Sequence, residues 1–153
     1  MAKAGDLWWT ELHSLKPDKA IKFYTGLMGW TAQTMSLTDM LKPAEKGEPG
    51  YTLFMNDGVP VCGCATMPDG DNNPPRWFTH LQVADVDESV KLAEKLGGKL
   101  LHGPWNVPTV GRVAIIADTE GATVGIGVPE ATALPPKTAR KSSAAKTKAK
   151  AKA

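Results

Sequence analysis

The sequence has no long apolar run, no leader-like start and no phosphate-binding glycine loop. None of its apolar stretches approaches the roughly 18 residues of a membrane helix, and no apolar segment precedes a cleavage site near Met1. We therefore expect a cytoplasmic protein without a membrane partner. Neither a P-loop pattern nor a G-x-S-x-G motif occurs, which argues against a nucleotide enzyme and a serine hydrolase.

Cysteine is scarce. Only Cys62 and Cys64 occur among the 153 residues. Side chains two apart on a strand point to the same face, but so close a pair does not readily close an unstrained disulfide. Two thiols without further soft ligands also fall short of a zinc site. We expect both to be buried and reduced.

Acidic and aromatic residues are absent after residue 131. Seven of the 18 basic residues follow that point, within 137–152, which leaves 11 against 16 acids before it, a net charge of −5. A Lys/Ala-rich segment buries too little apolar surface to offset its chain entropy, so we predict a globular domain over 1–131 and a disordered tail over 132–153. Residues 137–152 either contact nucleic acid or an anionic surface weakly, or only keep the chain in solution.

The chain repeats itself at a shift of 69 residues. The segment WWTEL at 8–12 returns as WFTHL at 77–81, and Asp18, Ile21, Leu27 and Gly29 align with Asp87, Val90, Leu96 and Gly98. We infer two modules, about 6–67 and 76–129, joined by a linker rich in Asp, Asn, Gly and Pro.

Each module shows an alternating strand pattern, then an amphipathic helix, then three further strand-like stretches. Pro17 suits the first turn of one helix, and Asp85 with Glu88 forms a capping-box pattern for the other. Glycines end both helices. The fold class is therefore α+β with two tandem βαβββ modules. The later strands are expected at 30–36, 51–56, 60–67, 98–103, 112–118 and 122–128.

The helix segment PDKAIKFYTGLMGW and the element DTEGATVGI before the last strand give the chain a family likeness. With the repeat, they resemble the vicinal oxygen chelate superfamily of glyoxalases, bleomycin-resistance proteins and extradiol dioxygenases, over about residues 6–129. The resemblance implies two modules whose curved mixed sheets surround a cavity for a small-molecule ligand. It also implies a homodimer.

The metal centre of that superfamily takes one ligand from the first strand and one from the last strand of each module. The resemblance places Trp9 and Phe78 at the first-strand positions and Gly63 and Gly125 at the last-strand positions. None of these side chains binds a metal. We therefore expect no cofactor and no metal site of the family type.

Strand alternation indicates which side chains face the ligand. It places Trp9, Glu11 and His13 on one face, and Trp8 with Thr10 and Leu12 on the other. Glu11 and His80 are repeat partners, predicted to approach each other either as catalytic acid and base or as a structural ion pair. The expected ligand-binding residues are aromatic or polar: Trp9, His13, Phe78, Gln82, Trp105 and Arg112.

Three functions fit these observations. The first is a small-molecule-binding protein with an aromatic-lined cavity and no metal. The second is a glyoxalase-like lyase or isomerase in which Glu11 and His80 move a proton on a small carbonyl compound. The third is a protein tethered to nucleic acid through its basic tail.

Overall fold

The computed structural model describes residues 3–130 and contains two helices and eight strands. The predicted disordered tail over 132–153 lies outside these residues. The element order is βαβββ twice, which confirms the predicted repeat. The elements are β1 (Leu7–Ser14), α1 (Pro17–Met28), β2 (Thr31–Ser36), β3 (Gly50–Asn56), β4 (Val59–Thr66), β5 (Arg76–Gln82), α2 (Val86–Lys95), β6 (Lys99–Val107), β7 (Gly111–Ala117) and β8 (Thr123–Pro129).

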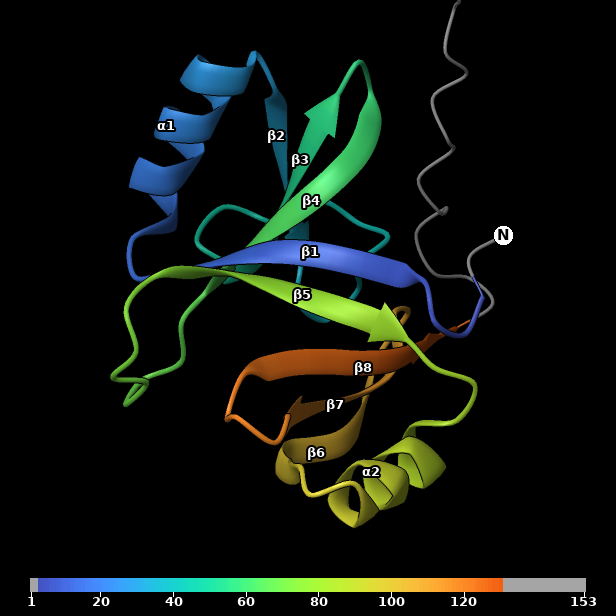
Figure 1. Ribbon diagram of the computed structural model, residues 1–153. Helices are drawn as coiled ribbons and strands as arrows, with labels where there is room; N and C mark the ends of the chain where they lie inside the picture. The colour runs from blue at the N-terminus through green and yellow to red at the C-terminus, as the bar shows by residue number, and fades with distance from the viewer. Residues whose placement is uncertain (1–2, 131–153) are drawn as a thin grey trace, which may run out of the picture.

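All eight strands form one mixed, curved sheet in the order β2-β3-β4-β1-β5-β8-β7-β6. Each module contributes four neighbouring strands, and the antiparallel pair β1 and β5 joins the two modules in the middle of the sheet (Figure 1). Within each module the first strand runs parallel to the last, β1 with β4 and β5 with β8. The order is therefore symmetric about the junction of β1 and β5.

The helices begin and end as their sequences predict, with one difference. Pro17 opens α1, and Gly29 ends it in the left-handed region at φ 67°. At α2 the Asp85 carboxylate accepts from the backbone N–H of Glu88 at 2.9 Å. The Glu88 carboxylate accepts instead from the Lys91 ammonium, so only half of the capping box forms.

Both helices cover the same face of the sheet, which we call the helix face. Leu12, Phe54, Cys62 and Cys64 are buried there under α1, and Val86 of α2 packs in a second cluster with Val90, Ala114 and Ile126. Neither cysteine forms a disulfide, and both are buried, as predicted.

The other face, which we call the site face, carries a third cluster. Met35, Met40 and Leu53 are its buried members, and Trp9, Tyr51, Met55 and Val110 pack against them. Val110 lies in the turn between β6 and β7, so a segment of the second module reaches across to the first. None of the described helices is long and apolar enough to cross a membrane.

The predicted face of Trp8 is wrong. A β-bulge between Leu7 and Trp9 places an extra residue on β1 opposite β5. The Trp8 ring consequently lies over Gly127 and beside His80, on the site face. Alternation beyond the bulge holds: Leu12 faces the helices, and Glu11 and His13 face the other way. The sixth strand is also longer than expected and continues to Val107.

Candidate functional site

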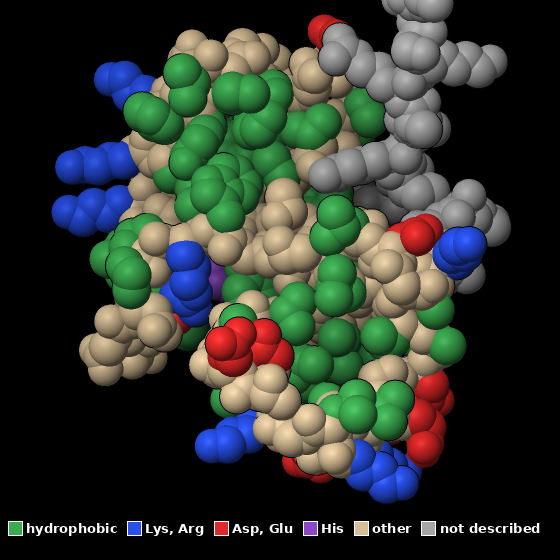
Figure 2. All heavy atoms as spheres, in the orientation of Figure 1, with side chains coloured by type: hydrophobic (Ala, Val, Ile, Leu, Met, Phe, Trp, Pro, Cys, Tyr) green, Lys and Arg blue, Asp and Glu red, His purple; other side chains and the backbone are tan. Residues whose placement is uncertain are grey.

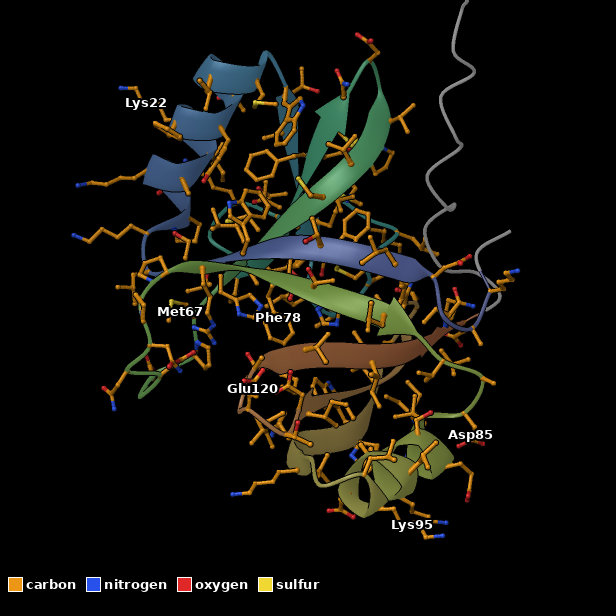
Figure 3. All side chains as sticks on the ribbon, viewed as in Figure 1. Lys22, Met67, Phe78, Asp85, Lys95 and Glu120 are labelled. Carbon is orange, nitrogen blue, oxygen red and sulfur yellow. The ribbon has the colours of Figure 1, made fainter. Side chains whose placement is uncertain are left out.

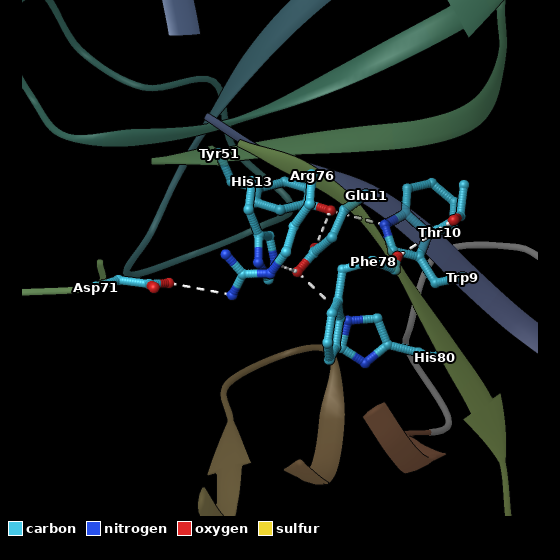
Figure 4. A network of polar contacts seen from close by, with 9 residues as sticks. All are labelled: Trp9, Thr10, Glu11, His13, Tyr51, Asp71, Arg76, Phe78 and His80. Carbon is cyan, nitrogen blue, oxygen red and sulfur yellow. Dashed lines mark hydrogen bonds and ion pairs between the residues drawn. The ribbon is translucent and has the colours of Figure 1, made fainter. Parts of the chain in front are cut away.

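Glu11, at the middle of the sheet, is the centre of a polar network on the site face (Figure 4). Its Oε1 accepts from Nε2 of His13 at 2.8 Å and from Nε2 of His80 at 3.3 Å. Its Oε2 accepts from the Tyr51 hydroxyl at 2.6 Å, and that hydroxyl accepts from Trp9 Nε1 at 2.7 Å. The predicted approach of Glu11 and His80 is therefore confirmed as a contact.

The surroundings of Glu11 keep it ionised. Burial by itself would raise the pKa of its carboxyl, but the hydrogen bonds from His13, His80 and Tyr51 lower the pKa far below 4.5. A carboxylate only accepts, so both histidine Nε2 atoms must carry the proton. Burial and the Glu11 charge raise the pKa of Tyr51, which keeps its hydroxyl a donor.

Two glycines make room for this network. Gly63 lies opposite Glu11 on β4, and a Cβ atom there would meet the Tyr51 hydroxyl oxygen at 1.8 Å. Gly125 lies opposite His80 on β8, and a Cβ atom there would meet His80 Nδ1 at 2.0 Å. The Tyr51 and His80 rings therefore occupy the places that side chains from the last strands would fill.

Glu11 and His80 are thus the first-strand residues that lie opposite Gly63 and Gly125. Trp9 and Phe78, which the resemblance assigns to the metal-ligand positions, lie two residues earlier on the same strands.

Four donors for a metal do not converge here. The glycines supply no side chain, and Glu11 is already bonded to both histidines and to Tyr51. Among residues 3–130, no group of three or more His, Cys, Asp or Glu side chains is arranged to hold a metal ion. The geometry therefore does not fit the metal centre that the resemblance implies.

A row of four rings crosses the junction of β1 and β5. The His13 ring stacks on Phe78 at 4.9 Å, Phe78 meets His80 edge to face at 5.1 Å, and Trp8 meets His80 at 6.4 Å. Phe78 is 4% exposed, whereas the side chains of His13 and His80 are about 15% exposed. The two imidazoles therefore reach the surface, whereas the phenyl ring does not. In Figure 2 one small area of histidine is visible at the surface, next to a basic side chain.

His80 has a free hydrogen-bonding position. Its Nε2 contacts Glu11, but its Nδ1 is buried and has no hydrogen-bond partner among the described residues. Buried polar atoms are usually paired, and unpaired ones are more common where a ligand binds or a reaction occurs. With the proton on Nε2, the neutral ring offers a lone pair at Nδ1.

The remaining predicted ligand-binding residues lie outside this network. Gln82 shares the site face, two residues beyond His80 and opposite Gly127. Trp105 is on the edge strand β6, with its ring 4.6 Å from that of His102. Arg112 reaches α2, where Nε and Nη2 donate to the Asp87 carboxylate at 2.7 and 2.8 Å.

Two hollows in the surface of the described residues also lie away from the Glu11 network. One, of about 550 Å³, runs between the start of α2 and the turn between β6 and β7, and Arg112 lines it. The other, of about 330 Å³, lies in the segment that follows β2. Neither is lined by Glu11 or His80, so neither is the aromatic cavity expected from the sequence.

Sequence reasoning missed Tyr51 and Trp8. Tyr51 is the second residue of β3, a strand that was predicted correctly, but no neighbouring residue in the sequence indicated that its hydroxyl reaches Glu11. The signal was Gly63: a glycine in a strand interior often marks the close approach of another group. The position of Trp8 on the site face was missed because the alternation of apolar and polar residues along β1 does not indicate the bulge between Leu7 and Trp9.

Comparison with known proteins decides the family. Residues 10–126 match the model of the Glyoxalase/Bleomycin resistance protein/Dioxygenase superfamily. The chain belongs to this superfamily. A putative glyoxylase of Mycobacterium tuberculosis, CFP32, is 29% identical over 124 residues, which are 81% of this chain and 44% of that protein. The anthracycline biosynthesis protein DnrV of Streptomyces peucetius is 32% identical over 131 residues, 77% of this chain and 45% of that protein.

The superfamily member described here thus spans less than half the length of these curated relatives. Among solved structures, methylmalonyl-CoA epimerase from Mycobacterium tuberculosis is similar with a TM-score of 0.56 and 16% identity, over 85% of this chain and 93% of that one. A hypothetical protein from Bacillus halodurans has a TM-score of 0.58 and 11% identity, over 87% of this chain and all of that one. At such identities the likeness concerns the fold alone.

Proposed function

We propose that this protein binds a small planar molecule on the site face, over the row of rings at the junction of its modules, and that it does so without a metal. The observation that carries the proposal is the row itself. Trp8, His13 and His80 present ring surface around the buried Phe78. Aromatic and imidazole rings suit a flat ligand, which they contact by stacking and edge-to-face packing.

Glu11 prepares this surface for binding. Its carboxylate fixes both imidazoles, so little side-chain freedom is lost when a ligand arrives. Arg76, opposite His13, adds a positive charge at one end of the network; its guanidinium donates to Asp71 at 3.1 Å and its side chain is 30% exposed. A planar ligand with a hydroxyl or carboxylate group suits this surface. The name of one relative, an anthracycline biosynthesis protein, supports an aromatic ligand.

A thermal-shift screen with planar phenols, quinones and aromatic carboxylates tests the proposal. A ligand that binds the folded state raises its stability by about 2.7 kcal/mol at one hundred times its Kd. We expect the increase for the wild type and for Arg112→Gln, which changes a residue outside the row, and not for His80→Ala. A panel without any stabilising compound, or equal stabilisation of His80→Ala, would contradict it.

Elemental analysis tests the absence of a metal. Protein purified without a histidine tag or added metal should contain far less than one transition-metal ion per chain. A stoichiometric amount of zinc, iron, nickel or manganese would overturn this part of the proposal, and Glu11, His13 and His80 would then be the residues to mutate.

A second candidate, proton transfer on a small carbonyl compound, is favoured by the contact between Glu11 and His80. Because its pKa is lowered, Glu11 is a weak base and acts by orienting His80. After the ring turns to expose Nδ1, that nitrogen would take a proton from the carbon beside the carbonyl and return it, with an enolate between the two steps. Exchange of that proton with deuterated solvent should require His80 and decrease in Glu11→Gln. Exchange that persists in His80→Gln would exclude this role.

A further inference from the structure

The sheet curves towards its site face. Val110, in the turn before β7, packs against the buried cluster of the first module, whose members come from β2, β3 and the segment between them. In a flat sheet β3 and β7 would lie five strand spacings apart, which is about 24 Å. Side chains from such distant strands meet only if the sheet bends, so the site face is the concave face.

The two modules fill this concave face to different extents. Leu53 on β3 and Ile115 on β7 each lie opposite one of the two glycines that make room for the polar network. Leu53 is 3% exposed, whereas Ile115 is only partly buried. Two residues earlier the first module has Tyr51, and the second has the much smaller Val113. The second module therefore leaves more of its concave face open.

Trp105 and His102 form one side of this open surface. Residues directly opposite each other on antiparallel strands share a face of the sheet. The register pairs Trp105 of β6 with Val113. It pairs His102 with Ile115, and the Trp105 and His102 rings lie 4.6 Å apart. Both rings therefore lie on the site face, at the edge of the second module.

Trp8 and His80 form the other side of the open surface. The Trp8 ring lies over Gly127. The His80 ring lies over Gly125. Both glycines belong to β8, which is two strand spacings, or about 10 Å, from β6. A fused two-ring compound is long enough to touch both sides while it covers the aliphatic side chains of β7 between them.

The His80 ring directs one nitrogen to each module. Its Nε2 contacts Glu11, as Figure 4 shows, whereas its Nδ1 lies 2.0 Å from where a Cβ atom of Gly125 would be. Nδ1 is buried and has no hydrogen-bond partner among residues 3–130. Phe78, labelled in Figure 3, lies between the His80 and His13 rings, so a ligand approaches Nδ1 from the second module.

We propose that the ligand lies on this open surface of the second module, between Trp8 and Trp105. It is a flat fused-ring compound with a hydroxyl group that donates a hydrogen bond to Nδ1 of His80. A carboxylate would only present further lone pairs to Nδ1, so the surface favours a phenolic hydroxyl over an acid. Because Nδ1 is buried in the free protein, a ring beside it must shift when the ligand enters. This inference rests on the proposed function and names the place and the chemical class of its ligand.

Two probes of similar shape test the hydroxyl group. The first, 2-naphthol, carries a donor, and the second, 2-methoxynaphthalene, has the same rings without one. By calorimetric titration of the full chain we expect 2-naphthol to bind about tenfold more tightly, which is the effect of one hydrogen bond. His80→Phe keeps a ring but loses the acceptor, so it should bind both probes equally. Equal affinities in the wild type, or a preference for 2-naphthol that persists in His80→Phe, would overturn the hydrogen bond.

Trp105→Ala tests the place. It removes one side of the surface and should weaken the binding of 2-naphthol about tenfold, with unchanged circular dichroism. Ile115→Phe, which fills the space between the two sides, should have the same effect. The matched control is Trp77→Ala, because Trp77 is 42% exposed and lies on the helix face, where its indole donates to Tyr24. This control should bind 2-naphthol as the wild type does.

The outcomes separate this inference from the proposed function. If the wild type binds no planar compound, both are wrong. If 2-naphthol binds and requires His80, but Trp105→Ala and Ile115→Phe bind it as tightly as Trp77→Ala does, the proposed function stands and the place in the second module is wrong.

Discussion

The two modules fill the same backbone position in different ways. In the first module Gly63 leaves room for Tyr51, a residue of the neighbouring strand of the same module. In the second module Gly125 leaves room for His80, the residue directly opposite it. The repeat thus conserves a gap beside the first strand, and the side chain that enters the gap decides what each half can do.

This difference makes the site asymmetric across the junction of β1 and β5. The first module supplies a carboxylate whose two oxygens are both hydrogen-bonded within the protein. The second supplies an imidazole with one nitrogen bonded and the other unpaired among the described residues. A duplicated fold can therefore give one half the orienting carboxylate and the other half an imidazole with an open hydrogen-bonding position. The following variants test that division, from the largest expected effect to the smallest.

Replacing Glu11 by Gln should destabilise the protein most. A hydrogen bond to a buried charged group contributes up to about 3 kcal/mol, and here both His13 and His80 lose their charged acceptor. Denaturant unfolding at pH 7 measures it. A cost equal to that of the exposed Glu120→Gln would show that the first module does not anchor the site.

The stability difference between the wild type and Glu11→Gln should depend on pH. Because the folded pKa of Glu11 is lowered, its contribution is fully present above the ordinary value of 4.5 and is lost progressively as the pH falls below it, since the unfolded chain takes up the proton first. The stability difference between wild type and Glu11→Gln should therefore shrink between pH 5 and pH 3. A difference that grew on acidification would contradict the assignment of an ionised Glu11.

Gly63→Ala should close the gap in the first module. The added methyl meets the Tyr51 hydroxyl, so the ring must move away from Glu11 and Trp9, at a cost of about 2 kcal/mol. The control is Gly26→Ala, in the interior of α1 with nothing near its Cβ position; it should stabilise the protein by about 0.5 kcal/mol. Equal effects of the two substitutions would mean that Tyr51 does not need the gap.

Tyr51→Phe isolates one hydroxyl. It removes the group that donates to Glu11 and accepts from Trp9, which should cost about 1.5 kcal/mol. Tyr24→Phe is the matched control, because the Tyr24 hydroxyl also accepts from a tryptophan, Trp77 at 3.1 Å, but at an exposed position. It should change the melting temperature much less than Tyr51→Phe does.

The smallest effect is expected from Cys62→Val, which copies the second module into the first. Cys62 and Cys64 flank Gly63 where Val124 and Ile126 flank Gly125. A near-isosteric apolar exchange in a core should cost less than about 1.5 kcal/mol. Burial, first of all, raises the pKa of Cys64 to about 11, so the Cys64 thiol should react slowly with alkylating reagents at pH 8. Rapid labelling of the folded protein would contradict the packing.

Much of the fold could be read along the chain. The repeat, both helices, their first and last turns and all eight strands follow from residues close together in the sequence. The turn at Asp57-Gly58 shows why: both residues adopt positive φ, 50° and 76°, as a two-residue hairpin between Asn56 and Val59 requires. Such signals are local, so they survive without knowledge of the packing.

By itself the sequence determined the modules, their element order, the superfamily likeness and the nearness of Glu11 and His80, since repeat partners meet at a symmetric junction. Only the tertiary structure decided that Trp8 turns to the site face, that Tyr51 enters the gap at Gly63 and that Arg112 binds Asp87 instead. Each of these depends on a bulge or on contacts between strands and helices distant in the chain. Periodicity reports which way a regular strand faces, but it does not report where the strand is irregular or what packs against it.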